Sequence, residues 1–126
     1  MAIGKSIGEF SFTSSGVSIS STERGGMSQA VNMEGTATGF GTVIGTMTFY
    51  ADEPGSDSGR VTWAGSAYLD NGDSVVGEGR GVFDKAGTHK WRVRSIMRVS
   101  DGSLLLSEGE VNLEGRTYTG ALYAWE

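Results

Sequence analysis

Three glutamates and one arginine are the side chains of this sequence best suited to chemistry. Glu78 and Arg80 lie two residues apart, and Glu108 and Glu110 have the same spacing further along the chain. Residues two apart on a β-strand point to the same side of a sheet. If both stretches are strands that face one space, three carboxylates and one guanidinium share that space.

An excess of carboxylates in an enclosed space indicates acid–base chemistry. Like charges close together in apolar surroundings raise the pKa of a carboxyl group, and such a group is suited to general acid or base catalysis. We therefore predict catalytic roles for Glu78, Glu108 and Glu110, and we expect Arg80 to orient a substrate carboxylate or carbonyl. A structural polar network, or a position facing solvent, remains an open alternative for all four.

Neither a metal nor a cofactor is expected. The chain has no cysteine and a single histidine, His89, which excludes thiolate and histidine-based metal sites. A carboxylate-only Ca²⁺ or Mg²⁺ site would need a loop pattern that the sequence lacks. The Gly77-x-Gly79-x-Gly81 spacing has no helix after it, so it does not match a phosphate-binding loop.

Alternation with a period of two predicts the elements that must position these residues. It indicates strands at 8–20, 29–38, 42–51, 61–70, 73–83, 89–100, 103–113 and 117–125. Asn71-Gly72 is the strongest hairpin signal in the chain, and further turns are expected at 39–41, 86–87, 101–102 and 114–115. We expect an all-β fold, a closed eight-stranded antiparallel up-and-down barrel, because closure removes the unprotected edges of a sheet. Residues 1–126 are expected to form one domain, with 1–8 as a loose arm.

The turns determine which side chains share a face of the sheet. Two-residue turns place Glu78, Arg80, Glu108 and Glu110 on one face, which we take as the lumen. Gly77, Gly79 and Gly81 would then lie outside on a smooth surface, which predicts a homo-oligomer. The ligand contacts predicted for the lumen, with Glu34 added by the second strand, are Trp63, Trp91, Met97, Leu106, Tyr123, Trp125 and Glu34.

Composition limits the partners. The formal net charge of −5 and a pI of about 4.8 argue against nucleic acid and anionic membranes. No stretch has the length and apolarity of a membrane span, and the first residues have no apolar signal-peptide core. We expect a cytoplasmic protein.

From GEFSFTSS to ALYAWE, the predicted meander with polar groups in an apolar lumen resembles the allene oxide cyclase-like barrels, a calycin-like architecture that includes dirigent-type proteins. The resemblance implies a lumen that binds an apolar small molecule and directs its cyclisation or isomerisation, mostly by shape and without a cofactor. It is one of architecture and transfers no catalytic residue.

The sequence therefore predicts a cofactor-free isomerase or cyclase acting on a small apolar substrate. Two alternatives remain open: a binding or carrier barrel without chemistry, and a structural, oligomer-forming module whose lumen is filled. An empty lumen would favour the first two.

Overall fold

The computed structural model describes residues 3–21 and 26–125, which form eight strands and no helix. Their bounds are β1 (Ile3–Ser21), β2 (Met27–Ala37), β3 (Gly41–Ala51), β4 (Gly59–Tyr68), β5 (Ser74–Gly87), β6 (Lys90–Val99), β7 (Leu104–Asn112) and β8 (Thr117–Trp125). Each strand pairs antiparallel with the next, and β8 pairs with β1, so the sheet closes into a barrel. The predicted all-β, eight-stranded up-and-down barrel is thus confirmed.

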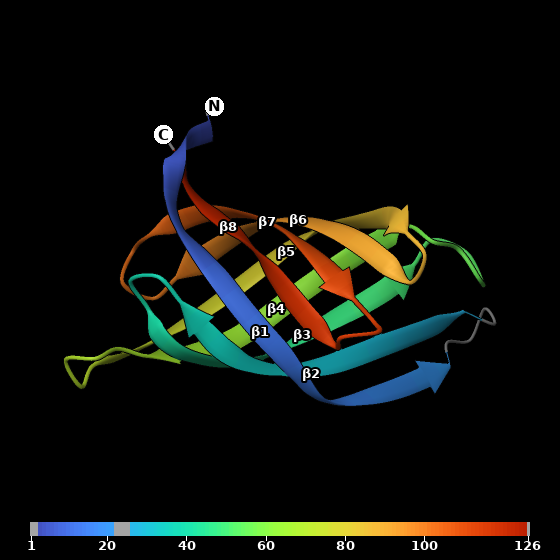
Figure 1. Ribbon diagram of the computed structural model, residues 1–126, viewed down its shortest axis with the longest axis horizontal. Helices are drawn as coiled ribbons and strands as arrows, with labels where there is room; N and C mark the ends of the chain where they lie inside the picture. The colour runs from blue at the N-terminus through green and yellow to red at the C-terminus, as the bar shows by residue number, and fades with distance from the viewer. Residues whose placement is uncertain (1–2, 22–25, 126) are drawn as a thin grey trace.

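The barrel has two unlike ends (Figure 1). The left end in that view carries the β2–β3, β4–β5 and β6–β7 turns together with both chain termini, and we call it the terminal end. The right end carries the β3–β4, β5–β6 and β7–β8 connections, and we call it the loop end. Residues 1–8 were expected as a loose arm. Residues 1–2 lie outside the described ranges, and residues 3–8 belong to β1, where Ile3 pairs with Trp125 and Ser6 with Tyr123. Across the described ranges there is no helix of a length and apolarity that could cross a membrane.

The β4–β5 turn differs from its prediction by one residue. Gly72 N–H donates to the Leu69 carbonyl at 3.0 Å, Leu69 N–H donates to the Asp73 carbonyl at 2.9 Å, and Gly72 has a φ of 94°. This is a three-residue loop, a turn followed by a left-handed glycine bulge, rather than a two-residue turn at Asn71-Gly72. Consequently Tyr68, not Leu69, pairs with Ser74.

The β6–β7 turn repeats this geometry. Gly102 N–H donates to the Val99 carbonyl, Val99 N–H donates to the Ser103 carbonyl, and the φ of Gly102 is 96°. The Asp101 side chain accepts the Ser103 N–H at 2.9 Å, and hydrogen bonding to Ser103 lowers the pKa of that carboxyl. The register again differs by one residue from a two-residue turn.

The β5–β6 turn lies two residues later than expected. It is formed by residues 88–89 rather than 86–87, with a bulge between Lys85 and Gly87 and a φ of 54° at His89. The β7–β8 register, by contrast, was right: Glu108 pairs with Ala121 and Glu110 with Thr119.

A shift of one residue reverses every side chain of a strand, because alternate residues point to opposite faces. The predicted faces of β4 and β6 are correct, and those of β5, β7 and β8 are inverted. Several apolar residues of the inverted strands β5 and β7 therefore lie on the outer wall, where Val76 is 59% exposed, Val82 51% and Leu104 48%.

Gly77, Gly79 and Gly81 face the lumen, which contradicts their predicted outer position. A Cβ atom added to Gly79 would lie 2.7 Å from the Ile96 carbonyl oxygen, and one added to Gly81 would lie 2.6 Å from Ser95 Cα. Neighbouring strands approach closely here, and Gly79 and Gly81 leave the room for that approach. The glycines of the smooth outer surface from which a homo-oligomer was inferred therefore belong to the inner face.

The middle of the lumen is closely packed. Val93 is 0% exposed, and Val61 and Met47 are each 2% exposed. Next to them the rings of Phe12 and Trp63 stack with 5.6 Å between centroids and 9° between planes. This central layer divides the lumen into two separate cavities, one toward each end of the barrel.

Candidate functional site

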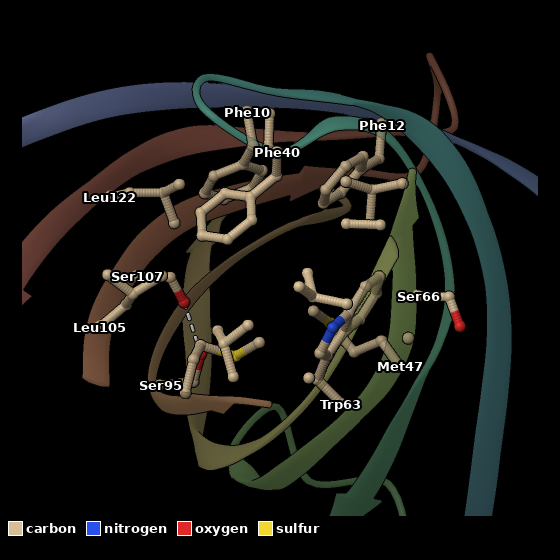
Figure 2. A pocket seen from close by; sticks show the side chains of 18 of the residues that line it. Phe10, Phe12, Phe40, Met47, Trp63, Ser66, Ser95, Leu105, Ser107 and Leu122 are labelled. Atoms are coloured by element: carbon tan, nitrogen blue, oxygen red, sulfur yellow. Dashed lines mark hydrogen bonds between the residues drawn. The ribbon is translucent and has the colours of Figure 1, made fainter. Parts of the chain in front are cut away.

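The first cavity lies inside the barrel toward the terminal end and measures about 90 Å³ (Figure 2). Alternate residues of all eight strands supply its wall, because every second side chain of a barrel strand points inward. The side chains and backbone that surround it carry no charge: Phe10, Phe12, Ala37, Phe40, Val43, Met47, Trp63, Gly65, Ser66, Ala67, Val75, Gly77, Ser95, Met97, Val99, Leu105, Ser107, Tyr118 and Leu122.

Two serines form a polar patch in this apolar wall. Ser95 of β6 and Ser107 of β7 are direct partners across the β6–β7 ladder, and their hydroxyl oxygens lie 2.5 Å apart. They are 9% and 7% exposed, and Figure 2 shows both on one side of the cavity, facing Trp63 and Met47 across it. Since an isolated hydroxyl is costly to bury, the pair satisfies itself by hydrogen bonding.

Tyr118 of β8 extends this patch. Its phenol hydrogen-bonds with Ser107, and the residue is 3% exposed. Burial raises the pKa of Tyr118 well above its ordinary value of 10.0, and the hydrogen bond to Ser107 acts in the opposite direction as the smaller effect. The group is therefore a neutral hydrogen-bond donor at physiological pH.

The three hydroxyls leave one donor unused. Each carries one O–H, and the two hydrogen bonds among Ser95, Ser107 and Tyr118 use two of the three protons, in whichever direction the serine pair is oriented. The third proton can serve a ligand oxygen, and the serine oxygens retain acceptor capacity. The site can orient one polar atom of an otherwise apolar molecule.

Phe40 covers part of the opening at the terminal end. It sits in the β2–β3 turn between Gly39 and Gly41, whose φ angles are 81° and 73°. Thr38 fastens this turn to β1: its N–H donates to the Glu9 carbonyl at 2.9 Å, and its hydroxyl accepts the Glu9 N–H at 3.1 Å. Figure 2 shows the Phe40 ring beside that of Phe10, over the cavity.

The four predicted catalytic residues lie on the outer wall, so their placement in the lumen was wrong. Glu78, Arg80, Glu108 and Glu110 are all exposed. Glu78 accepts a hydrogen bond from Arg98 at 2.7 Å, with more than two thirds of both side chains exposed. In the ladder between β6 and β7, Glu108 faces Arg94 and Glu110 faces Arg92. The charged residues alternate outward along β5, β6 and β7, where water solvates them.

The predicted ligand contacts divide into three groups. Trp63 and Met97 line the first cavity, and their role as ligand contacts stays a prediction. Trp91 faces the lumen at the loop end, away from the first cavity. The others point outward, Glu34 because it alternates with buried Met33, and the remaining three because β7 and β8 are inverted relative to the prediction: Leu106, Tyr123 and Trp125.

The aromatic and hydroxyl parts of the cavity were not predicted from the sequence. Phe10, Phe12 and Tyr118 were not singled out, and neither were Ser95 and Ser107 as a pair. One available signal was that charges alternate at positions 78 and 80, 92 and 94, and 108 and 110. Regular alternation of charge on neighbouring strands is typical of an outer face, which places the residues between them inside.

Comparison with known proteins gives no relative: no family model matches the chain, and neither a curated protein nor a solved structure is significantly similar to it. Within the described residues, no cluster of three His, Cys, Asp or Glu side chains is placed to hold a metal ion.

The buried phenol gives a prediction at alkaline pH. The unfolded chain ionises Tyr118 near its ordinary value of 10.0, whereas the folded protein retains the proton because its pKa is raised. Stability is therefore unaffected by this group below pH 10 and falls as the pH rises above 10, by at most about 1.4 kcal/mol per pH unit. In urea unfolding at pH 8 and pH 11, Tyr118→Phe should gain stability relative to the wild type at the higher pH. An identical difference at both pH values would contradict the assignment.

Proposed function

We propose that the protein is a binding barrel for a small, uncharged, largely apolar molecule, which occupies the cavity at the terminal end. The observation that carries the proposal is the hydroxyl patch of Ser95, Ser107 and Tyr118 in an otherwise apolar wall. A mostly apolar pocket with a few convergent polar groups is the usual form of a small-molecule site. The ligand class is an apolar molecule with a single hydroxyl or carbonyl oxygen.

The size of the cavity limits the ligand. At about 90 Å³ it is smaller than an engineered cavity of about 150 Å³ that holds benzene. A ring can therefore enter only if Phe40 moves from the opening. A longer molecule would place one end in the cavity and leave the remainder at the mouth.

A binding or carrier role agrees with the cavity better than the isomerase or cyclase predicted from the sequence. That chemistry was assigned to lumen carboxylates, and no carboxylate lines the cavity. The resemblance to allene oxide cyclase-like barrels remains one of architecture. The cytoplasmic location and the homo-oligomer stay predictions, and an oligomer contact would now involve exposed apolar side chains of the outer wall such as Ile96 and Leu104.

A pair of probes matched in shape tests the hydroxyl patch. Toluene has a methyl group where phenol has a hydroxyl group. We therefore expect phenol to bind about threefold to tenfold more tightly than toluene, which corresponds to one net hydrogen bond. Binding is followed by NMR through the indole N–H signal of Trp63, which lines the cavity. The triple variant Ser95→Ala, Ser107→Ala, Tyr118→Phe removes all three hydroxyls together and leaves none unpaired, and it should abolish the preference.

A size series at Gly77 tests the location. A Cβ atom on Gly77 meets its nearest neighbours at 3.6 and 3.9 Å, which is ordinary contact, and the residue lines the cavity. Gly77→Leu should therefore fill the space and prevent phenol binding, while Gly77→Ala retains it. Glu108→Gln, on the outer wall, is the control and should bind as the wild type does. Unchanged binding by Gly77→Leu would refute the site.

A further inference from the structure

A second cavity lies at the loop end of the barrel and shares no lining residue with the first. Its volume is about 490 Å³, within the range of about 300 to 1,000 Å³ that small-molecule sites occupy. It lies between the β3–β4 and β7–β8 connections, on the loop-end side of the central packed layer. We call it the loop-end cup.

Aromatic side chains form much of its wall. Phe49 of β3 and Phe83 of β5 meet edge to face, with 5.3 Å between centroids and 81° between planes. Trp91 of β6 lines the cup beside them, and Val31 and Val111 add aliphatic surface. Phe49, Trp91 and both valines are only partly buried, since one side packs on the core and the other faces the cup. A planar apolar molecule would cover this remaining surface.

The loop-end cup has one cationic side chain among its described lining residues, that of Arg116. Arg116 of the β7–β8 turn lines the cup, and no ion pair joins it to a carboxylate of residues 3–21 or 26–125. The acidic lining residue Asp57 is 3.7 Å from Lys85, which offsets its charge. The remaining polar groups of the rim are neutral: Ser14, Gln29, Ser56, Asn112 and Thr117.

The backbone of Arg116 is in an unfavourable conformation. Its φ is 54°, in the left-handed region that suits glycine and disfavours an arginine. Two hydrogen bonds hold it there: its N–H donates to the Leu113 carbonyl at 3.2 Å, and its carbonyl accepts the Ser14 N–H at 2.8 Å. Glycine would fit this position with less strain, so the arginine is not required by the backbone conformation of the turn.

We infer that the loop-end cup is a second binding site, for an aromatic carboxylic acid. The ring system lies against Trp91, Phe49 and Phe83, and the carboxylate lies at Arg116, whose planar guanidinium matches a carboxylate with two parallel hydrogen bonds. This inference is independent of the first cavity, because different residues and a different charge define it.

The test compares 4-tert-butylbenzoate with 4-tert-butylbenzamide, a neutral molecule of the same shape. We expect calorimetry at low salt to show that 4-tert-butylbenzoate binds at least tenfold more tightly than 4-tert-butylbenzamide. In NMR spectra the indole N–H signal of Trp91 should shift, while those of Trp63 and Trp125 should not. A shift confined to Trp63 or Trp125, or equal affinity for the two molecules, would overturn the inference.

Substitution of Arg116 separates binding from folding. Arg116→Gly relieves the backbone strain, so its melting temperature should be unchanged or higher, while the preference for benzoate over benzamide disappears. Arg116→Gln keeps the length of the side chain without the charge and should lose the same preference; Arg116→Lys should retain most of it. Wild-type benzoate affinity in Arg116→Gly or Arg116→Gln would refute the role of the guanidinium.

Discussion

Replacing Gly81 by alanine is expected to destabilise the barrel by about 3 kcal/mol, whereas the same change at Gly77 should leave its stability unchanged or slightly higher. The two glycines lie on β5, face the lumen and are four residues apart. At Gly81 a methyl group meets the backbone of β6, including the Arg94 carbonyl oxygen, and this backbone cannot move without disturbing the ladder. At Gly77 the same methyl group has ordinary contacts.

The free energies of unfolding of the two variants, measured by urea denaturation, provide the comparison. Because both substitutions add the same methyl group on the same strand, intrinsic strand preference cancels between them. If β5 had the orientation predicted from the sequence, both methyl groups would be solvated on the outer wall. The two variants should then have equal stability. Equal stability of Gly81→Ala and Gly77→Ala would therefore contradict the lumen-facing orientation of β5.

The strand content was predictable because it depends on local signals. The period of two, glycines at the ends of strands and a nearly proline-free chain are sufficient to give eight strands and to favour closure. The orientation of each strand was less accessible, since it depends on whether a turn has two or three residues. Leu69-Asp70-Asn71-Gly72 and Val99-Ser100-Asp101-Gly102 contain the same Asn-Gly or Asp-Gly pair that forms a two-residue turn.

Side-chain hydrogen bonds favour the three-residue loop at both the β4–β5 and the β6–β7 turn. Asn71 accepts the Asp73 N–H, and Asp101 accepts the Ser103 N–H, both at 2.9 Å. Each bond is made by the residue just before the left-handed glycine. Such a contact can be inferred only as a preference of Asn and Asp for turns, and it does not specify the number of loop residues. β6 kept its predicted face because the separate error in the β5–β6 turn reversed the orientation a second time. The error in the β6–β7 turn then inverted β7, and β8 followed it because the β7–β8 register was right.

The prediction of the candidate site depended on the orientation of each strand more than the prediction of the fold did. A barrel closes with either face inward, but only one orientation brings Ser95, Ser107 and Tyr118 together. Trp63 was placed in the lumen correctly because β4 kept its predicted face. It stacks on Phe12, whose strand was identified but whose register was left open. The contacts between β1 and the rest of the barrel join residues far apart in the sequence, and no local pattern specifies them.

Replacing Trp63 by alanine is expected to cost about 3 to 5 kcal/mol of stability, the range for removing a large buried aromatic side chain. Trp63 is 8% exposed, stacks on Phe12 and contacts the space that Gly45 and Gly65 leave free. A Cβ atom on Gly65 would lie 2.8 Å from the indole ring, so the absence of a side chain at these two glycines leaves the room that the ring occupies. Their backbone cannot collapse into the void that the alanine leaves.

Trp125→Ala is the matched control, since it removes the same side chain from the outer wall and should cost about 1 kcal/mol or less. The void left by Trp63→Ala is lined by apolar groups, and such voids bind apolar molecules. Added indole should therefore raise the melting temperature of Trp63→Ala more than that of the wild type or of Trp125→Ala, because a ligand that binds only the folded state stabilises it. If both variants lose equal stability and indole rescues neither, Trp63 does not fill the centre of the barrel, and the packed layer that separates the two cavities would have to be assigned to other residues.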